Sequence, residues 1–130
     1  MMVVDTSAII AVLLQEEDAQ RYADAIEGTE QPLISAASLV EAGIVLHARH
    51  GPKAVDQLRL FLEEGGFQIE GVTSDQAWQA LDAFARFGKG QGNEAQLNYG
   101  DCFAYALAKT ADQPLLFKGQ DFIHTDIKAA

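Results

Sequence analysis

Residues 2–14 read MVVDTSAIIAVLL, and this stretch decides the fold. It begins with an apolar run, Met2-Val3-Val4, which predicts a short buried strand. The polar residues Asp5-Thr6-Ser7 follow the run. Behind them, apolar side chains return at helical spacing, at Ile9, Ile10, Leu13 and Leu14. We therefore predict a strand that passes directly into a helix, with Asp5 at the junction.

The same succession of strand and helix repeats along the chain. Further strands are predicted at residues 32–34, 67–70 and 115–117, and the alternating segment 67–70 is typical of a half-buried strand. Helices are predicted at about residues 18–26, 35–50 and 102–110 by their apolar spacing and their stop signals. A further helix carries Val55, Leu58, Phe61 and Leu62 and stops at Gly65-Gly66, and another opens at the capping box Thr73-x-x-Gln76 and carries Trp78, Leu81 and Phe84. Residues 88–98 are rich in glycine and polar side chains, which predicts a mobile loop.

Strands that alternate with helices pair in parallel through right-handed crossovers. We therefore predict an α/β fold with a small central parallel sheet covered by helices on both faces. A chain of 130 residues with 48% hydrophobic residues is enough for one ordinary core. We expect a single domain spanning residues 1–130.

The composition restricts the possible partners and compartment. With 9 Lys and Arg against 19 Asp and Glu, the formal net charge is -10, which disfavours non-specific adhesion to nucleic acid or anionic membranes. Cys102 is the single cysteine, so the chain can form neither an internal disulfide nor a thiolate zinc cluster. The amino terminus does not resemble a signal peptide, and no apolar stretch approaches the roughly 20 residues that span a bilayer. We expect a cytoplasmic protein.

Four acidic residues lie where a predicted strand ends or a predicted helix begins: Asp5, Glu41, Asp101 and Asp121. In open α/β sheets the ligand crevice lies beyond the carboxyl ends of the strands, so distant acids can become neighbours there. Several carboxylates in one crevice repel one another and keep protons unless a cation compensates them. Mg²⁺ and Mn²⁺ prefer oxygen ligands and can activate water for attack on a phosphate ester. The pattern therefore indicates metal-dependent phosphodiester cleavage.

Each acid also has a purely structural interpretation. Asp5 could cap the helix that follows it. Glu41 completes Ser38-x-x-Glu41, which matches a capping box if the helix begins at Ser38, whereas a start at Ser35 leaves Glu41 free. The two later acids could support a helix start and close a turn. Taken singly, each acid leaves both interpretations open, and the ordered set favours the metal site.

Four segments of the chain, in this order, resemble the PIN-domain nucleases and, more narrowly, the VapC-type toxins of bacterial toxin–antitoxin pairs. They are Val3-Val4-Asp5-Thr6-Ser7-Ala8, Ile34-Ser35-Ala36-Ala37-Ser38-Leu39-Val40-Glu41, Leu97-Asn98-Tyr99-Gly100-Asp101-Cys102-Phe103-Ala104-Tyr105-Ala106-Leu107-Ala108 and Leu115-Leu116-Phe117-Lys118-Gly119-Gln120-Asp121-Phe122. The resemblance extends over nearly the whole chain, and the last two segments are its most specific part.

The resemblance implies a PIN-like fold in which Asp5, Glu41 and Asp101 hold Mg²⁺ or Mn²⁺, with a further catalytic acid near Asp121. It also implies cleavage of RNA, homodimerisation and inhibition by a cognate VapB-type antitoxin. Many members of the family place the fourth acid three residues before the Phe of the last segment, where this chain has Gly119. Asp121 stands one residue before that Phe, so it departs from the pattern.

Several other residues allow more than one interpretation. The hydroxyl of Ser7 could hold a water or a phosphate, or cap the helix. Three basic residues flank the expected crevice and could contact phosphate or remain solvated: Arg86, Lys89 and Lys118. We expect Cys102 to be a small core residue, not a nucleophile. On the helix from residue 74, we expect Trp78 and Phe84 in the core or at a dimer surface.

Two other functions remain open. Asp5 could act as the nucleophile of an aspartyl phosphotransferase, although the second acid expected two residues later is replaced by Ser7. Alternatively, the acids could be helix caps in a non-catalytic regulatory or interaction domain.

Overall fold

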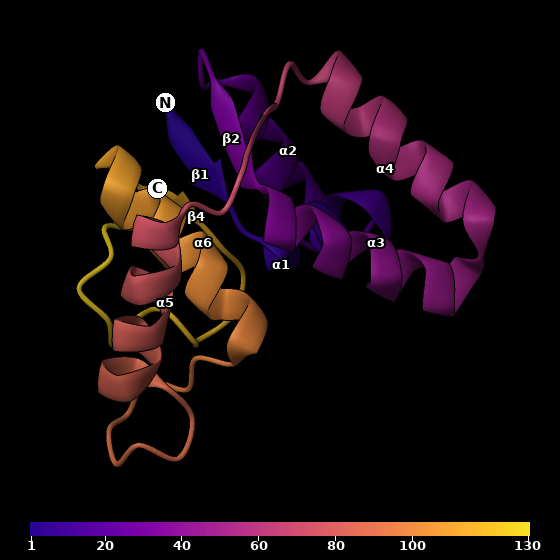
Figure 1. Ribbon diagram of the computed structural model, residues 1–130. Helices are drawn as coiled ribbons and strands as arrows, with labels where there is room; N and C mark the ends of the chain where they lie inside the picture. Colours follow the sequence, from indigo (N-terminus) through magenta and orange to yellow (C-terminus); the bar gives the residue numbers. More distant parts are fainter.

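The computed structural model describes residues 1–130 and is built around a four-stranded parallel sheet in the order β3-β2-β1-β4 (Figure 1). The strands are β1 (Met2–Val4), β2 (Pro32–Ser35), β3 (Gln68–Glu70) and β4 (Leu115–Leu116). The helices are α1 (Thr6–Leu13), α2 (Ala19–Glu27), α3 (Ala36–His50), α4 (Pro52–Glu64), α5 (Ser74–Phe87) and α6 (Tyr99–Ala111). The predicted order of strands and helices is confirmed.

The sheet is covered on both faces because successive side chains of a strand point to opposite sides. Met2 and Val4 of β1 belong to one core, which they share with residues of α1, α2, α3 and α4. Val3 belongs to a second core, formed with α5 and α6. Figure 1 shows α5 and α6 together on one side of the sheet and α1, α3 and α4 on the other. The predicted fold class is therefore confirmed.

Strand β3 differs from its prediction. The alternating pattern predicted that its apolar side chain would be buried, yet Ile69 is 50% exposed. β3 is an edge strand that pairs only with β2, where Ile69 lies opposite the fully buried Ile34. Ile69 borders an apolar groove of about 340 Å³ between α3 and α4, so no side chain covers it fully.

The loop between α5 and α6 is fixed at its base. Its backbone forms a bridge between Gly88 and Leu97, in which Lys89 N donates to Leu97 O at 2.9 Å and Leu97 N donates to Phe87 O at 3.0 Å. Leu97 is fully buried in the core beneath α5 and α6, and Ala95 in the same loop is also fully buried. The polar composition of the segment correctly predicts a loop but hides these two core residues.

The parallel topology directs several chain segments to one edge of the sheet. Asp5 directly follows β1, β2 ends at Ser35, and the segment after β4 carries Asp121. α6 leads back to the start of β4, so its amino end, with Asp101, lies at the same edge. None of the helices has the length and apolar character needed to cross a lipid bilayer.

Candidate active site

Asp5 is both a helix cap and a buried acid. Its side chain is the N-cap of α1, and its Oδ2 accepts hydrogen bonds from Ser7 N at 3.0 Å and Ser7 Oγ at 2.6 Å. The residue is 3% exposed, and its Oδ1 is buried without any hydrogen-bond partner. Burial, together with the charge of Glu41, raises the pKa of Asp5 to about 6, although the bonds from Ser7 oppose this shift. Capping therefore accounts for one carboxylate oxygen and leaves the other free.

Glu41 does not take part in capping α3. Ser35 caps α3 by accepting a hydrogen bond from Ala37 N at 3.2 Å, so the helix begins before Ser38 and the Ser38-x-x-Glu41 capping box does not form. Glu41 then lies in the second turn of α3. Its carboxylate lies against Gly100, where a Cβ atom would overlap it, and its charge acts on Asp5.

Asp101 opens α6 in a reciprocal capping box with Asn98. Asp101 Oδ2 accepts from Asn98 N at 3.0 Å, and Asn98 Oδ1 accepts from Asp101 N at 2.9 Å. The helix therefore begins three residues earlier than predicted, at Tyr99. Asp101 is 8% exposed, and burial, with repulsion from Asp5 and the adjacent Asp121 carboxyl, raises its pKa to about 8.

Asp121 comes close enough to Asp101 to influence its protonation. The position where many family members carry the acid, Gly119, has φ +103, a backbone conformation that side-chain-bearing residues rarely adopt. An acid at this position would strain the present loop. The backbone after β4 thus favours Asp121 over position 119 as the acid of this segment, and Asp121 lies close to Asp101.

The structure therefore brings all four predicted acids to the carboxyl edge of the sheet. They do not form a cage in which three or more His, Cys, Asp or Glu side chains already surround one metal ion. The Oδ1 of Asp5 is buried without a partner, and burial together with repulsion between the acids raises the pKa values of Asp5 and Asp101, so positive charge at this edge would stabilise the ionised carboxylates. A divalent cation with oxygen ligands would supply that charge, and Mg²⁺ typically needs only one or two carboxylates beside its waters.

Two of the three predicted phosphate contacts are engaged elsewhere. Arg86 pairs with Asp82 and Asp126, each at 3.6 Å, and lies over the ring of Phe87. Lys118 forms ion pairs with Glu16 and Asp18 in the turn between α1 and α2. Lys89 is exposed in the α5–α6 loop and has no ion pair.

Cys102 is a core residue, as predicted. It is 4% exposed, and its Sγ donates to Asn98 O at 3.3 Å. Burial raises the pKa of the thiol to about 11, which keeps it protonated and unreactive.

Gly100 is the site residue that sequence reasoning missed. Its lack of a side chain makes room for the Glu41 carboxylate between α3 and α6. A signal was available, because a glycine in the first turn of a helix is unfavourable unless another demand requires it.

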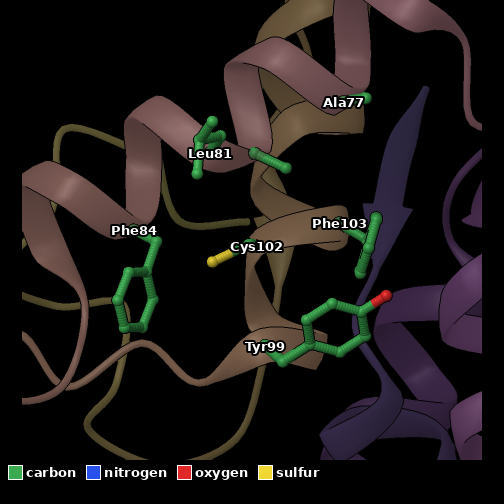
Figure 2. A pocket seen from close by; sticks show the side chains of 7 residues that line it. Ala77, Leu81, Phe84, Tyr99, Cys102 and Phe103 are labelled. Atoms are coloured by element: carbon green, nitrogen blue, oxygen red, sulfur yellow. The ribbon is translucent and has the colours of Figure 1, made fainter.

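An apolar groove lies beside the acids, between α5 and the start of α6 (Figure 2). It encloses about 460 Å³ and is lined by Ala77, Ala80, Leu81, Phe84, Tyr99, Cys102 and Phe103. Tyr99 is 80% exposed, and the nearby α5 residues Trp78 and Leu81 are 71% and 60% exposed. Trp78 is therefore not in the core, whereas Phe84 packs against the core beneath α5 and α6.

Comparison with known proteins gives a consistent result. The model of the PIN domain family matches residues 2–128. Ribonuclease VapC28 of Mycobacterium tuberculosis is 49% identical over 132 residues, covering 99% of this chain and 97% of the relative. Two solved structures share the fold. VapC20 of Mycobacterium tuberculosis, described as a sarcin-ricin loop cleaving toxin, has a TM-score of 0.82 at 18% identity and covers 100% of this chain and 98% of its own. VapBC2 from Rickettsia felis, bound to a DNA fragment from its promoter, has a TM-score of 0.77 at 12% identity, covering 98% and 95%.

The raised pKa values predict an unusual pH dependence of stability. Between the ordinary value of 3.8 and the folded values of about 6 for Asp5 and about 8 for Asp101, the folded state binds more protons than the unfolded state. Without divalent cations, the free energy of unfolding should therefore fall as pH rises through this range. Urea unfolding at a series of pH values, followed by circular dichroism, measures this free energy of unfolding. Millimolar Mg²⁺ should restore stability at about pH 8 and have little effect at about pH 5. A free energy of unfolding that stays constant or rises with pH over this range would contradict the raised pKa values of Asp5 and Asp101.

Proposed function

The chain belongs to the PIN domain family, and we propose that it is a metal-dependent endoribonuclease acting as the toxin of a VapC-type toxin–antitoxin pair. One observation carries the proposal: four acids from distant segments converge at one edge of the sheet, and Asp5 keeps a buried oxygen without a partner. A relative of 49% identity named a ribonuclease supports the same activity. The family match spans residues 2–128 and does not favour an aspartyl phosphotransferase or a non-catalytic regulator.

The cofactor that we propose is Mg²⁺, with Mn²⁺ as a substitute. Asp5, Glu41 and Asp101 would hold it, with Oδ1 of Asp5 as one ligand atom, and Asp121 would complete the acidic site. The bound ion would supply a water activated for attack on the phosphodiester and would neutralise charge on the reacting phosphate.

The protein's own residues prepare the site for this ion. Ser7 and Asn98 bind the Oδ2 atoms of Asp5 and Asp101, so helix caps fix the orientation of both carboxylates. Near neutral pH, the raised pKa of about 8 keeps a proton on Asp101 in the absence of a cation. Cation binding would release that proton, since the ionised carboxylate is then compensated.

A protein with a net charge of -10 repels RNA, so binding requires positive charge at the site where the RNA is cut. A bound divalent cation provides it, because the ion attracts a phosphate oxygen to an edge that otherwise repels it. We propose that the protein cuts RNA in the cytoplasm and is inhibited there by a VapB-type antitoxin. The solved structure of VapBC2 from Rickettsia felis, which has a similar fold, supports the proposal of an antitoxin partner.

We further propose that the protein forms a homodimer through the apolar surface of α5 and α6. Trp78, Leu81 and Tyr99 are the large exposed side chains of this surface. Together with the groove of about 460 Å³, they form a contiguous apolar area of the kind that marks protein interfaces. Its position beside Asp101 would place a second copy next to the cleavage site.

Replacing Asp5 tests the activity. Asp5→Asn should keep the helix cap but lose the charge that holds the cation, so the rate of RNA cleavage should fall by at least about 100-fold. The measurement uses purified protein freed of antitoxin and single-stranded RNA with Mg²⁺ or Mn²⁺. Asp56→Asn, at an exposed position of α4, is the matched control and should cleave normally. Full activity in Asp5→Asn, or no cleavage by the wild type with either metal, would contradict the proposal.

Two glycines in helices offer a sharper test of Glu41. A methyl group at Gly100 would overlap the Glu41 carboxylate, so Gly100→Ala should displace it and strongly reduce metal-dependent cleavage. At Gly43, the nearest atom to an added Cβ is Leu58 Cδ2 at 3.8 Å, an ordinary contact. Gly43→Ala should therefore keep full activity and stabilise the fold by about 0.5–1 kcal/mol. Equal activity in the two variants would contradict the expectation that cleavage requires the Glu41 carboxylate in its present position beside Gly100.

The dimer surface can be tested at Leu81. Leu81→Glu places a charge in the apolar groove and should convert the dimer to a monomer in sedimentation equilibrium. Leu60→Glu, at a position on α4 that is also half exposed, should remain dimeric. A monomeric wild type, or a dimer that survives Leu81→Glu, would disprove this interface.

A further inference from the structure

Lys118 connects the acid cluster to the turn between α1 and α2. Its Nζ donates to Glu16 Oε1 at 2.7 Å and to Asp18 Oδ1 at 2.9 Å. Its backbone N donates to Ser7 Oγ at 2.9 Å, across a sequence separation of 111 residues. The hydrogen bonds to Glu16 and Asp18 raise the pKa of Lys118, and the bond from Lys118 lowers the pKa of Asp18, so these charges persist at neutral pH.

The contact with Ser7 continues to Asp5. The Ser7 hydroxyl accepts the Lys118 N–H and donates its only hydrogen to Asp5 Oδ2 at 2.6 Å. The Ser7 N–H donates to the same oxygen at 3.0 Å. Oδ2 is thereby fully occupied, and the orientation of the carboxylate is fixed, with Oδ1 buried and unpartnered.

The ion pairs of the Lys118 side chain give the backbone at this position an anchor in addition to the contact with Ser7. Lys118 is the second residue after β4 and precedes Gly119, whose φ of +103 makes the following backbone turn sharply. The hydrogen bond from its backbone N to Ser7 Oγ ties Lys118 to the first turn of α1, and the two ion pairs tie it to the turn between α1 and α2. Because two carboxylates already engage its ammonium group, Lys118 is poorly placed to serve as a phosphate contact.

We propose that Lys118 is a positioning residue for RNA cleavage. Its ion pairs with Glu16 and Asp18 hold its backbone N–H on Ser7, and Ser7 in turn keeps the Asp5 carboxylate oriented with Oδ1 available to the divalent cation. This inference rests on the proposed metal-dependent ribonuclease activity. It assigns to Lys118 and Ser7 the role of supporting a metal ligand, for which loss of a supporting hydrogen bond typically costs 10–100-fold in metal affinity or activity.

Cleavage kinetics of Lys118→Met test the proposal. The concentration of Mg²⁺ or Mn²⁺ that gives half-maximal cleavage should rise by about 10–100-fold, with little change in KM for RNA at saturating metal. Lys118→Arg should recover most of the metal affinity, because it can keep both ion pairs. Lys128→Met, which removes an exposed lysine without an ion pair, is the matched control and should behave as the wild type. A higher KM for RNA with an unchanged metal requirement would instead identify Lys118 as a phosphate contact and overturn the proposal.

Two further variants separate positioning from a general loss of structure. Glu16→Gln combined with Asp18→Asn removes the same ion pairs from the opposite side and should reproduce the Lys118→Met effect. If Lys118 acts through Ser7, adding Lys118→Met to Ser7→Ala should cause little further loss. Additive losses would overturn the proposal.

Mn²⁺ binding measured by titration calorimetry without RNA provides a readout that does not depend on cleavage. The proposal predicts weaker Mn²⁺ binding in Lys118→Met than in Lys128→Met. Absence of RNA cleavage by the wild type would contradict the proposed function. Cleavage by the wild type with an unchanged metal requirement and unchanged Mn²⁺ binding in Lys118→Met would contradict this inference alone.

Discussion

The repulsion among carboxylates at the carboxyl edge of the sheet is the constraint on which the site depends. Asp5 and Asp101 are 3% and 8% exposed, and the charges of Glu41 and Asp121 act on them. Burying acids without a compensating charge raises their pKa values and costs stability. The fold therefore holds these side chains in a state that a divalent cation relieves, and this links the packing of the sheet edge to the proposed activity.

Helix capping and metal binding are complementary at this site. Asp5 caps α1 through Oδ2 and keeps Oδ1 free, while Asp101 shares a capping box with Asn98 and still faces the other acids. A cap fixes a carboxylate by short hydrogen bonds to backbone N–H groups, so its remaining oxygen has a defined position. For Asp5 and Asp101, the structural interpretation as capping residues thus explains how their carboxylates are oriented, whereas Glu41 does not cap its helix.

Three of the nine Lys and Arg residues form ion pairs within the fold. Lys109 and Arg86 pair with Asp126, which also accepts a hydrogen bond from Tyr105, and together they attach the last residues of the chain to α5 and α6. Lys118 secures the segment after β4 to the turn after α1. Because these three cations are engaged in internal contacts, they are not free to bind a polyanion, and the proposed metal ion would supply positive charge at the acidic edge instead.

The sequence by itself determined the order of strands and helices and the covering of both sheet faces, which follow from apolar periodicity and capping residues. It also singled out the four acids, through their ordered set and the resemblance to the PIN-domain nucleases. Only the tertiary structure decided that α3 begins at Ala36 and frees Glu41, that Ile69 lies at an open edge, and that Gly100 makes room for a carboxylate. The same holds for the contact between Lys118 and Ser7. Each of these depends on atoms that meet only when distant segments pack together, and no local pattern encodes such a distance.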